Sequence, residues 1–179
     1  MGMSEFKFDP RPDFGIPWAS RQSWRAAHQS FAHHLRRYTA NLKPLKMRAQ
    51  TLESLFRGVF PILDELCAAS CPWCPEPCCL KASVWFDFKD LLFMHVNQLL
   101  IPPCQSKTNL KNPCCYHGSS GCRLPRINRP WICTWYLCPT QTAILRKDHF
   151  AEHESLKRTF HQIKSKRNFL ESEYIRIIS

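Results

Sequence analysis

The sequence is poor in glycine and lacks any long run of apolar residues. Only 5 of its 179 residues are glycine, and none belongs to the Gly-x-Gly-x-x-Gly loop that holds a nucleotide pyrophosphate between a strand and a helix. The most apolar stretch, residues 84–101, is interrupted by Asp87, Lys89, Asp90 and several amides. A membrane-spanning helix needs about 20 predominantly apolar residues. We therefore expect neither a dinucleotide-binding loop nor a membrane span.

The N-terminal residues do not form the pattern of a secretory leader. Residues 1–14 read MGMSEFKFDPRPDF and place acidic residues and prolines where a leader needs an unbroken apolar segment. This pattern predicts a cytoplasmic protein, in which thiols stay reduced. The chain has 11 cysteines, an odd number that leaves one thiol unpaired in any full set of intramolecular disulfides. Metal ligation is therefore favoured over disulfides and over a scatter of inert core thiols.

Acidic residues are also scarce, because 14 of them face 25 lysines and arginines, for a formal charge of +11. Such an excess of bases is typical of proteins that bind nucleic acid. Thiolates around a metal ion would lower this total, and the bases of residues 146–167 alternate with acids that can pair with them along a helix. An unknown protein partner is possible, and a nucleic-acid partner is possible but not favoured.

Apolar residues recur at three- and four-residue spacing in three parts of the chain, which predicts helices there. Residues 18–66 contain two predicted helices, which Pro44 separates. Ser83 is placed to cap a third helix, which ends before Pro102. The chain is predicted to be helical again from Thr140 onward.

The predicted fold is one mainly α-helical domain, small and irregular, built around a cysteine-rich metal centre. N-terminal helices account for residues 1–66 and C-terminal helices for residues 139–179. Between them, residues 67–138 form two cysteine-rich loops that flank a helix. Proline makes residues 67–79 unsuited to a helix, and residues 104–139 have no regular period. Only tertiary contact can bring the two loops together.

The first cysteine group supplies closely spaced thiols. It reads Cys71-Pro-Trp-Cys74-Pro-Glu-Pro-Cys78-Cys79, preceded by Cys67. Spacings of two or three residues let one tight loop aim successive sulfurs at a common centre, as in zinc and iron–sulfur sites. Neighbouring side chains point in opposite directions in an extended backbone. One of Cys78 and Cys79 could therefore ligate while the other serves a second ion or packs behind it.

The second cysteine group contains four further candidate ligands, Cys114, Cys122, Cys133 and Cys138. Gly118 and Gly121 permit the sharp turns that would bring Cys114 and Cys122 together. Three arginines nearby could offset thiolate charge or lie on a solvated surface, namely Arg123, Arg126 and Arg129. Three tryptophans could shield the site from water or pack in the core, namely Trp73, Trp131 and Trp135.

These two groups resemble the CxxCxxCC cysteine-cluster proteins, the zinc- or iron-chelating domains of the YkgJ type. The first group carries the cysteine run, with three residues before Cys78-Cys79 where the family usually has two. The second group matches a cysteine followed by Gly-Cys, a hexapeptide, Arg-Pro, two residues and a final cysteine, through Cys114, Gly121-Cys122, Arg129-Pro130 and Cys133. The resemblance covers residues 67–138 and implies metal binding, with iron–sulfur and zinc both proposed for the family.

Eight cysteines are best placed as metal ligands: Cys71, Cys74, Cys78, Cys79, Cys114, Cys122, Cys133 and Cys138. They suit two zinc ions, or one four-iron cluster with thiols left over, and ligand softness does not separate zinc from iron–sulfur. We favour an iron–sulfur cluster with a redox, sensing or catalytic role. The alternative is a structural zinc module whose helical or basic surface binds a protein or nucleic-acid partner.

The histidines give weaker metal signals. His117 lies within the second cysteine group and could replace a thiolate. His149, Glu152 and His153 match the H-x-x-E-H pattern of inverted zinc peptidases, but a polar helix face explains them better. His28 is expected on the surface, together with His33 and His34, among arginines that would disfavour a metal cation.

Overall fold

The computed structural model describes residues 16–107, 109, 111–119 and 121–179. These residues form a mainly α-helical fold, which confirms the predicted fold class. The α-helices are α1 (Arg21–Arg37), α2 (Lys43–Ser70), α3 (Cys78–Lys81), α4 (Phe88–Val96), α5 (Ile132–Trp135), α6 (Pro139–Asp148) and α7 (Phe150–Ile178). Short 3-10 turns add η1 (Thr39–Asn41), η2 (Cys71–Trp73) and η3 (Arg126–Asn128).

The structure bears on the prediction about a membrane span and does not bear on the one about a secretory leader. Among the described residues, no helix has both the length and the apolar character that crossing a membrane requires. Residues 1–14, on which the expectation about a secretory leader rests, lie outside the described residues.

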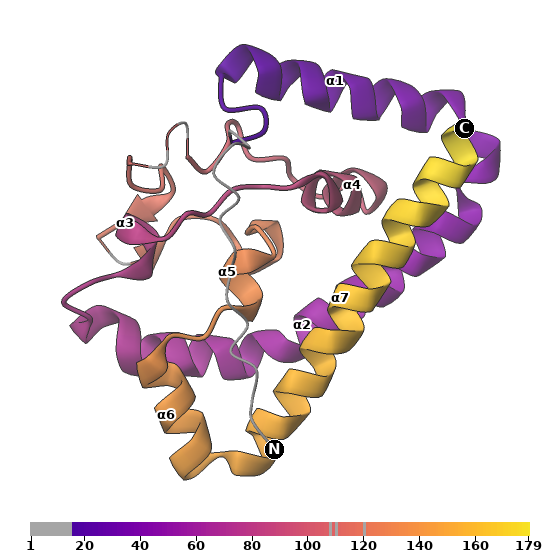
Figure 1. The fold of residues 1–179 in the computed structure, drawn as a ribbon. Coiled ribbons are helices and arrows are strands. Elements are labelled where there is room, and N and C mark those ends of the chain that lie inside the picture. The colour runs from indigo at the N-terminus through magenta and orange to yellow at the C-terminus, as the bar shows by residue number, and fades with distance from the viewer. Residues whose placement is uncertain (1–15, 108, 110, 120) are drawn as a thin grey trace.

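Three long helices outline a triangular frame, with α1 along one side, α7 along the second and part of α2 along the third (Figure 1). The first part of α2 packs against α7. Pro61, which lacks an amide hydrogen, lies inside α2, and the helix changes direction partway along its length (Figure 1). Helix α6 lies at the corner where α2 and the start of α7 diverge.

Apolar residues at helical spacing join the frame into one core. The fully buried side chains of α2 include Leu45, Leu52 and Leu66, and those of α7 include Ile163 and Leu170. Side chains of this kind each contribute about 1.5–3 kcal/mol when they leave water. These helices therefore supply much of the hydrophobic core, which also includes side chains of α4 and Tyr116 of the second cysteine group.

Helix α4 lies inside the frame, and its start differs from the sequence prediction. Asp87, and not Ser83, caps it: Asp87 Oδ1 accepts from Asp90 N at 2.8 Å, and Asp90 Oδ2 accepts from Asp87 N at 3.0 Å. Both Ser83 and Asp87 fit the preference for a capping residue. The reciprocal bond to Asp90 is available only to Asp87, because the two residues are three positions apart.

The first cysteine segment is more helical than its prolines predict. Cys67 lies in the last turn of α2, and Cys71 begins the turn η2 that continues from it. Cys78 and Cys79 open the four-residue helix α3. The prediction that residues 67–79 form a loop is therefore wrong at both ends. It holds between Trp73 and Cys78, where the prolines are concentrated.

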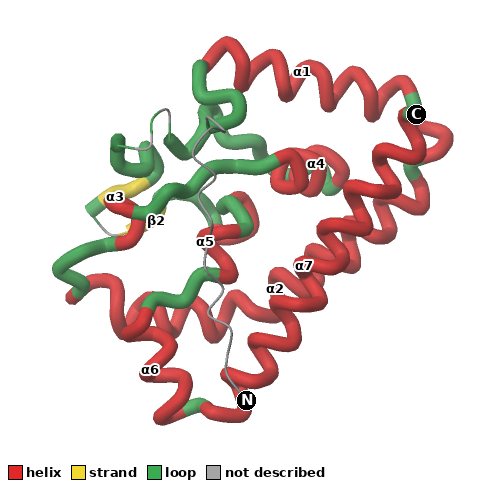
Figure 2. The backbone as a smooth tube through the Cα atoms, viewed as in Figure 1, coloured by secondary structure: helices red, strands yellow, loops and turns green. Residues whose placement is uncertain are grey.

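Loops gather on one side of the molecule, around α3, β2 and α5, whereas the long helices form the rest (Figure 2). The sequence prediction that residues 104–139 are irregular is largely confirmed: among the described residues of this stretch, the elements that precede the start of α6 at Pro139 are short, namely β1 (His117–Gly118), β2 (Gly121–Cys122), η3 and α5. The C-terminal region is two helices, because His149 interrupts it between α6 and α7.

A buried ion pair fastens the second cysteine loop to the frame. Arg167 of α7 is 2% exposed and donates to Asp90 Oδ1 at 2.7 Å and to both carboxylate oxygens of Asp87 at 2.9 Å. Asp90 also accepts from Trp131 N at 3.1 Å, and Trp131 immediately precedes α5. Helices α4 and α7 and the loop of Cys133 therefore meet at one carboxylate.

Candidate metal centre

The backbone brings the two cysteine groups together. Cys114 N donates to Cys79 O at 3.1 Å, a bond between residues of the two groups. Cys115 N donates to Ser106 O at 2.9 Å, which fixes the start of the second group against the segment that precedes it. The first and second groups are therefore neighbours and do not lie on opposite sides of the molecule.

A hairpin returns Cys122 toward Cys114, as the glycines predict. Strands β1 and β2 pair antiparallel, with Gly118 opposite Gly121 and His117 opposite Cys122. Gly121 has φ 104°, a conformation that side chains other than hydrogen disfavour. His117 is three residues after Cys114, and Cys122 lies across the hairpin from it.

Five of the predicted ligands are close enough for their charges to interact. Burial raises the pKa of the Cys133 thiol, and negative charge on Cys114, Cys122 and Cys78 raises it further. Burial likewise raises the pKa of Cys114, with a contribution from Cys122. The pKa of Cys79 is raised by its hydrogen bond with Cys78 and by burial, and then by the charges of Cys133 and Cys122.

Cys78 and Cys79 interact at the start of α3. A hydrogen bond between their thiols lowers the pKa of Cys78 to about 6, with help from two backbone amides and against the opposing effect of burial. The same interaction raises the pKa of Cys79. Two such thiols titrate as a pair, and the pair readily supplies one thiolate, the form that binds metal.

The thiols, as they are placed, do not converge on one point. Among the residues that the structure describes, no three side chains of histidine, cysteine, aspartate or glutamate are arranged to hold a metal ion. All 11 cysteines are free thiols and none is fully buried. The thiols as placed therefore do not form a complete metal site.

A second group of thiols lies where α2 meets α6. Gln141 Nε2 donates to Cys67 Sγ at 3.6 Å and to Cys71 Sγ at 3.9 Å, and Arg126 Nη2 donates to Cys67 Sγ at 3.6 Å. Cys138 instead caps α6, because its sulfur accepts from Gln141 N at 3.5 Å. Of these thiols, Cys71 and Cys138 are predicted ligands, and they are not grouped with Cys114 and Cys122.

A third pair of thiols was not among the predicted ligands. Cys104 Sγ and Cys115 Sγ are 3.5 Å apart. Tyr116 accepts from Cys104 N at 3.2 Å and donates to Cys104 O at 2.6 Å. Burial raises the pKa of Cys115, and negative charge on Cys104 and on Cys114 raises it further, so this pair lies next to the thiols that interact with Cys133.

Two sequence signals could have pointed to residues that the predictions left out. Cys67 and Cys71 are four residues apart, the spacing that places two side chains on one face of a helix, but the prolines obscured the continuation of α2. Gln141 three residues after Cys138 fits a capping pattern. No local signal marks Gln141 as a donor to sulfurs 70 and 74 residues earlier in the chain.

The arginines and tryptophans of the site divide between roles. Arg126 contacts sulfur and also pairs with Asp64, with Nε 2.6 Å from the carboxylate. Arg129 donates to Leu124 O at 3.0 Å, so it supports the loop backbone. Trp131 packs between Phe56 and Phe160 in edge-to-face contacts. Trp73 is 84% exposed and shields nothing.

The histidines do not add a ligand to this group. His117 contributes its backbone to the hairpin. Among the described residues, its ring makes no hydrogen bond to a cysteine. His149 and His153 lie at the start of α7, away from the cysteine loops (Figure 1). The expectation that His28 is a surface residue is wrong, because its Nδ1 is 3.0 Å from His95 Nε2 in a partly buried pair.

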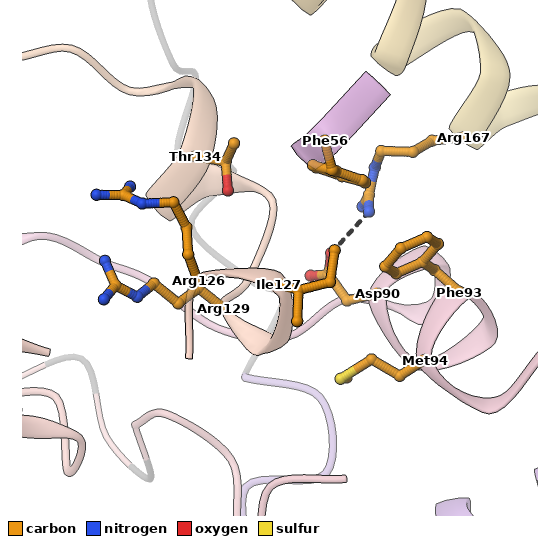
Figure 3. A pocket seen from close by; sticks show the side chains of 9 residues that line it. All are labelled: Phe56, Asp90, Phe93, Met94, Arg126, Ile127, Arg129, Thr134 and Arg167. Carbon is orange, nitrogen blue, oxygen red and sulfur yellow. Dashed lines mark hydrogen bonds and ion pairs between the residues drawn. The ribbon is translucent and has the colours of Figure 1, made fainter. Parts of the chain in front are cut away.

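A small cavity lies behind the cysteine loop, between η3, α4, α5 and α7. Its volume is about 10 Å³, which is room for about one water molecule. Arg167 and Asp90 form an ion pair at its wall, and Arg126 and Arg129 line the side nearest the second cysteine loop (Figure 3). A cavity of this size cannot enclose an organic substrate, so it does not indicate an active site.

Comparison with known proteins yields no relative: no family model matches the chain, and neither a curated protein nor a solved structure is significantly similar to it.

Proposed function

We propose that the chain is a metal-binding protein whose centre is held by Cys79, Cys114, Cys122 and Cys133. The observation that supports this set most directly is the bond from Cys114 N to Cys79 O at 3.1 Å, which joins residues 35 positions apart at the two cysteine groups. The hairpin then returns Cys122 to Cys114. The interactions of Cys133 with Cys114 and Cys122 complete the set.

Four thiolates match the ligand count of a tetrahedral zinc site and of a four-iron cluster. Cys78 is a fifth thiol beside this quartet. The remaining predicted ligands, Cys71, Cys74 and Cys138, would serve a second ion if two are bound.

We favour an iron–sulfur cluster as the bound metal group, with a redox, sensing or catalytic role. The four thiols of the quartet are partly buried. Limited solvent access is one of the means by which proteins set a cluster potential. Structural zinc is the second candidate, because the regular elements of the loops are short, and structural zinc supplies folding free energy to such regions.

Metal and acid-labile sulfide analysis of the anaerobically purified chain tests the proposal. A brown protein whose visible absorption is lost on dithionite reduction supports the cluster, and a colourless protein with stoichiometric zinc supports the alternative. Cys122→Ser should lose the bound metal or cluster. Cys104→Ser is the matched control outside the quartet and should keep it. A wild-type chain that retains neither metal after reconstitution contradicts both candidates.

A further inference from the structure

Three consecutive polar residues are buried directly before the second cysteine group. Gln105 and Ser106 are each 1% exposed and Lys107 is 2% exposed. Buried polar groups normally have hydrogen-bond partners, because an unpaired one has a large desolvation cost. The partners of these three residues therefore indicate what each of them is for.

The first two residues are fully engaged by the fold. Gln105 Oε1 accepts from Phe86 N at 2.7 Å, and its Nε2 donates to Phe86 O at 3.0 Å and to Pro17 O at 2.9 Å. Ser106 Oγ donates to Val84 O at 2.8 Å. These side chains hold the segment in place and need nothing more.

Lys107 differs from its neighbours. Among the residues that the structure describes, its Nζ has no hydrogen-bond partner although the atom is buried. An ammonium group removed from water costs several kcal/mol unless an anion compensates it. The side chain is among the largest that are fully buried, so the fold encloses a cation for which the described chain supplies no partner.

The surroundings of Lys107 identify where an anion would be. Ser106, the preceding residue, accepts a bond from Cys115 N through its carbonyl at 2.9 Å, and Cys114 N bonds to Cys79 O. The Lys107 segment, Cys114 and Cys79 are therefore successive neighbours.

We propose that Lys107 is a counter-ion built into the fold for the metal–thiolate centre, acting through the buried positive charge that it holds in the segment paired with Cys114 and Cys115. This inference rests on the proposed function and deepens it, because it specifies that the metal centre with its thiolate ligands has a net negative charge. Four thiolates around zinc or a four-iron cluster meet that requirement. Lys107 is a positioning residue, because it affects the metal centre through the thiolate ligands and does not bind the metal itself.

The test compares Lys107→Met with wild type in two states, the chelator-treated chain and the chain saturated with Zn²⁺. Methionine keeps an unbranched side chain and removes the charge. In the chelator-treated state, the variant should unfold at the same temperature as wild type or at a higher one, because an uncompensated buried cation is gone. In the Zn²⁺-saturated state the variant should unfold at a lower temperature than wild type.

Affinity for Zn²⁺, measured by competition with a chromophoric chelator, should fall about 10–100-fold, the usual loss when a group that supports a metal ligand is removed. Lys107→Arg keeps the charge and should recover part of this affinity. Lys111→Met, an exposed lysine four residues on, is the matched control and should bind as wild type does. If the chain is reconstituted with ferrous iron and sulfide, Lys107→Met should lower the reduction potential, because loss of a nearby positive charge disfavours the more negative reduced cluster.

Failure of this inference can be told from failure of the proposed function. A wild-type chain that binds neither Zn²⁺ nor iron and sulfide overturns both. A wild-type chain that binds metal while Lys107→Met binds it equally well overturns the role of Lys107 alone. Loss of stability in the chelator-treated variant also overturns it, because Lys107 would then serve the fold itself.

Discussion

The helical frame and the cysteine region are stabilised in different ways. Helices α2 and α7 bury leucine and isoleucine side chains completely, including Leu52 and Ile163. The cysteine region has elements of two to four residues, no fully buried thiol and an exposed tryptophan. Both regions share one hydrophobic core, because Tyr116 belongs to it and Cys114, Cys122 and Trp131 pack against it. The frame is therefore ordered by long helices, whereas the cysteine region is ordered by individual contacts with the core and with the frame.

The largest expected effect comes from breaking the link between the two regions. Arg167→Met removes the cation that compensates Asp90 and leaves a buried carboxylate beside Trp131. Truncating one partner of a buried ion pair costs about 3–5 kcal/mol, so the free energy of unfolding in urea should fall by that amount. Arg176→Met is the control on the same helix: the Arg176 side chain is 68% exposed in its ion pair with Glu173, and the loss should stay below about 1 kcal/mol. Equal losses would mean that the buried pair does not fasten the loop.

A smaller effect is expected from the histidine pair inside the frame. Burial lowers the pKa of His95 to about 4, with a contribution from His28, and burial also lowers the pKa of His28. The unfolded chain takes up protons near the ordinary pKa of about 6.5, so these histidines stabilise the fold fully above that pH. Their contribution is lost as the pH falls from about 6.5 toward 4.

His95→Phe isolates this contribution, because phenylalanine can keep the stacking on Phe31 that His95 makes. Burial raises the pKa of Asp90 to about 7, so Asp90 changes the free energy of unfolding with pH in the opposite direction to the histidines. The quantity to measure is therefore the difference in pH dependence between the variant and wild type. Urea midpoints should depend less on pH in the variant between pH 6.5 and 4, and His33→Asn, at an exposed site, should follow wild type. An unchanged pH dependence in His95→Phe would show that the pair does not carry it.

The smallest effect is expected at the exposed edge of the cysteine region. Trp73 is 84% exposed, so Trp73→Ala should change the free energy of unfolding by no more than about 0.5 kcal/mol. It should also leave the metal content unchanged, since the side chain does not cover the thiols. A marked loss of metal or of stability would show that the loop closes over the site in solution, and thermal unfolding with metal analysis distinguishes these results.

Local patterns in the sequence predicted most of the frame and the turn at the site. Helical spacing places Leu52 in the core, and Gly121 predicts the hairpin, because both depend on residues nearby in the chain. The cap at Asp87 was missed in favour of Ser83, since choosing between them depends on the pairing with Asp90.

Contacts between distant residues could not be predicted in the same way. The pairing of His28 with His95 spans 67 positions, and no periodicity encodes it. The burial of Lys107 is equally hidden, because it depends on how the segment before the second cysteine group packs. The sequence grouped eight cysteines by spacing alone, whereas their grouping in space depends on the route of the backbone between them.

The most direct test of the central claim is a comparison of one cysteine from each loop. The Zn²⁺ bound per chain and its affinity would be measured for Cys79→Ser, Cys122→Ser and the double variant after anaerobic reconstitution. If thiols of both loops share one centre, each single variant loses the same tightly bound ion and the double variant loses nothing further from that site. If each single variant loses a different ion and the double variant loses both, the loops bind metal separately and the account is contradicted.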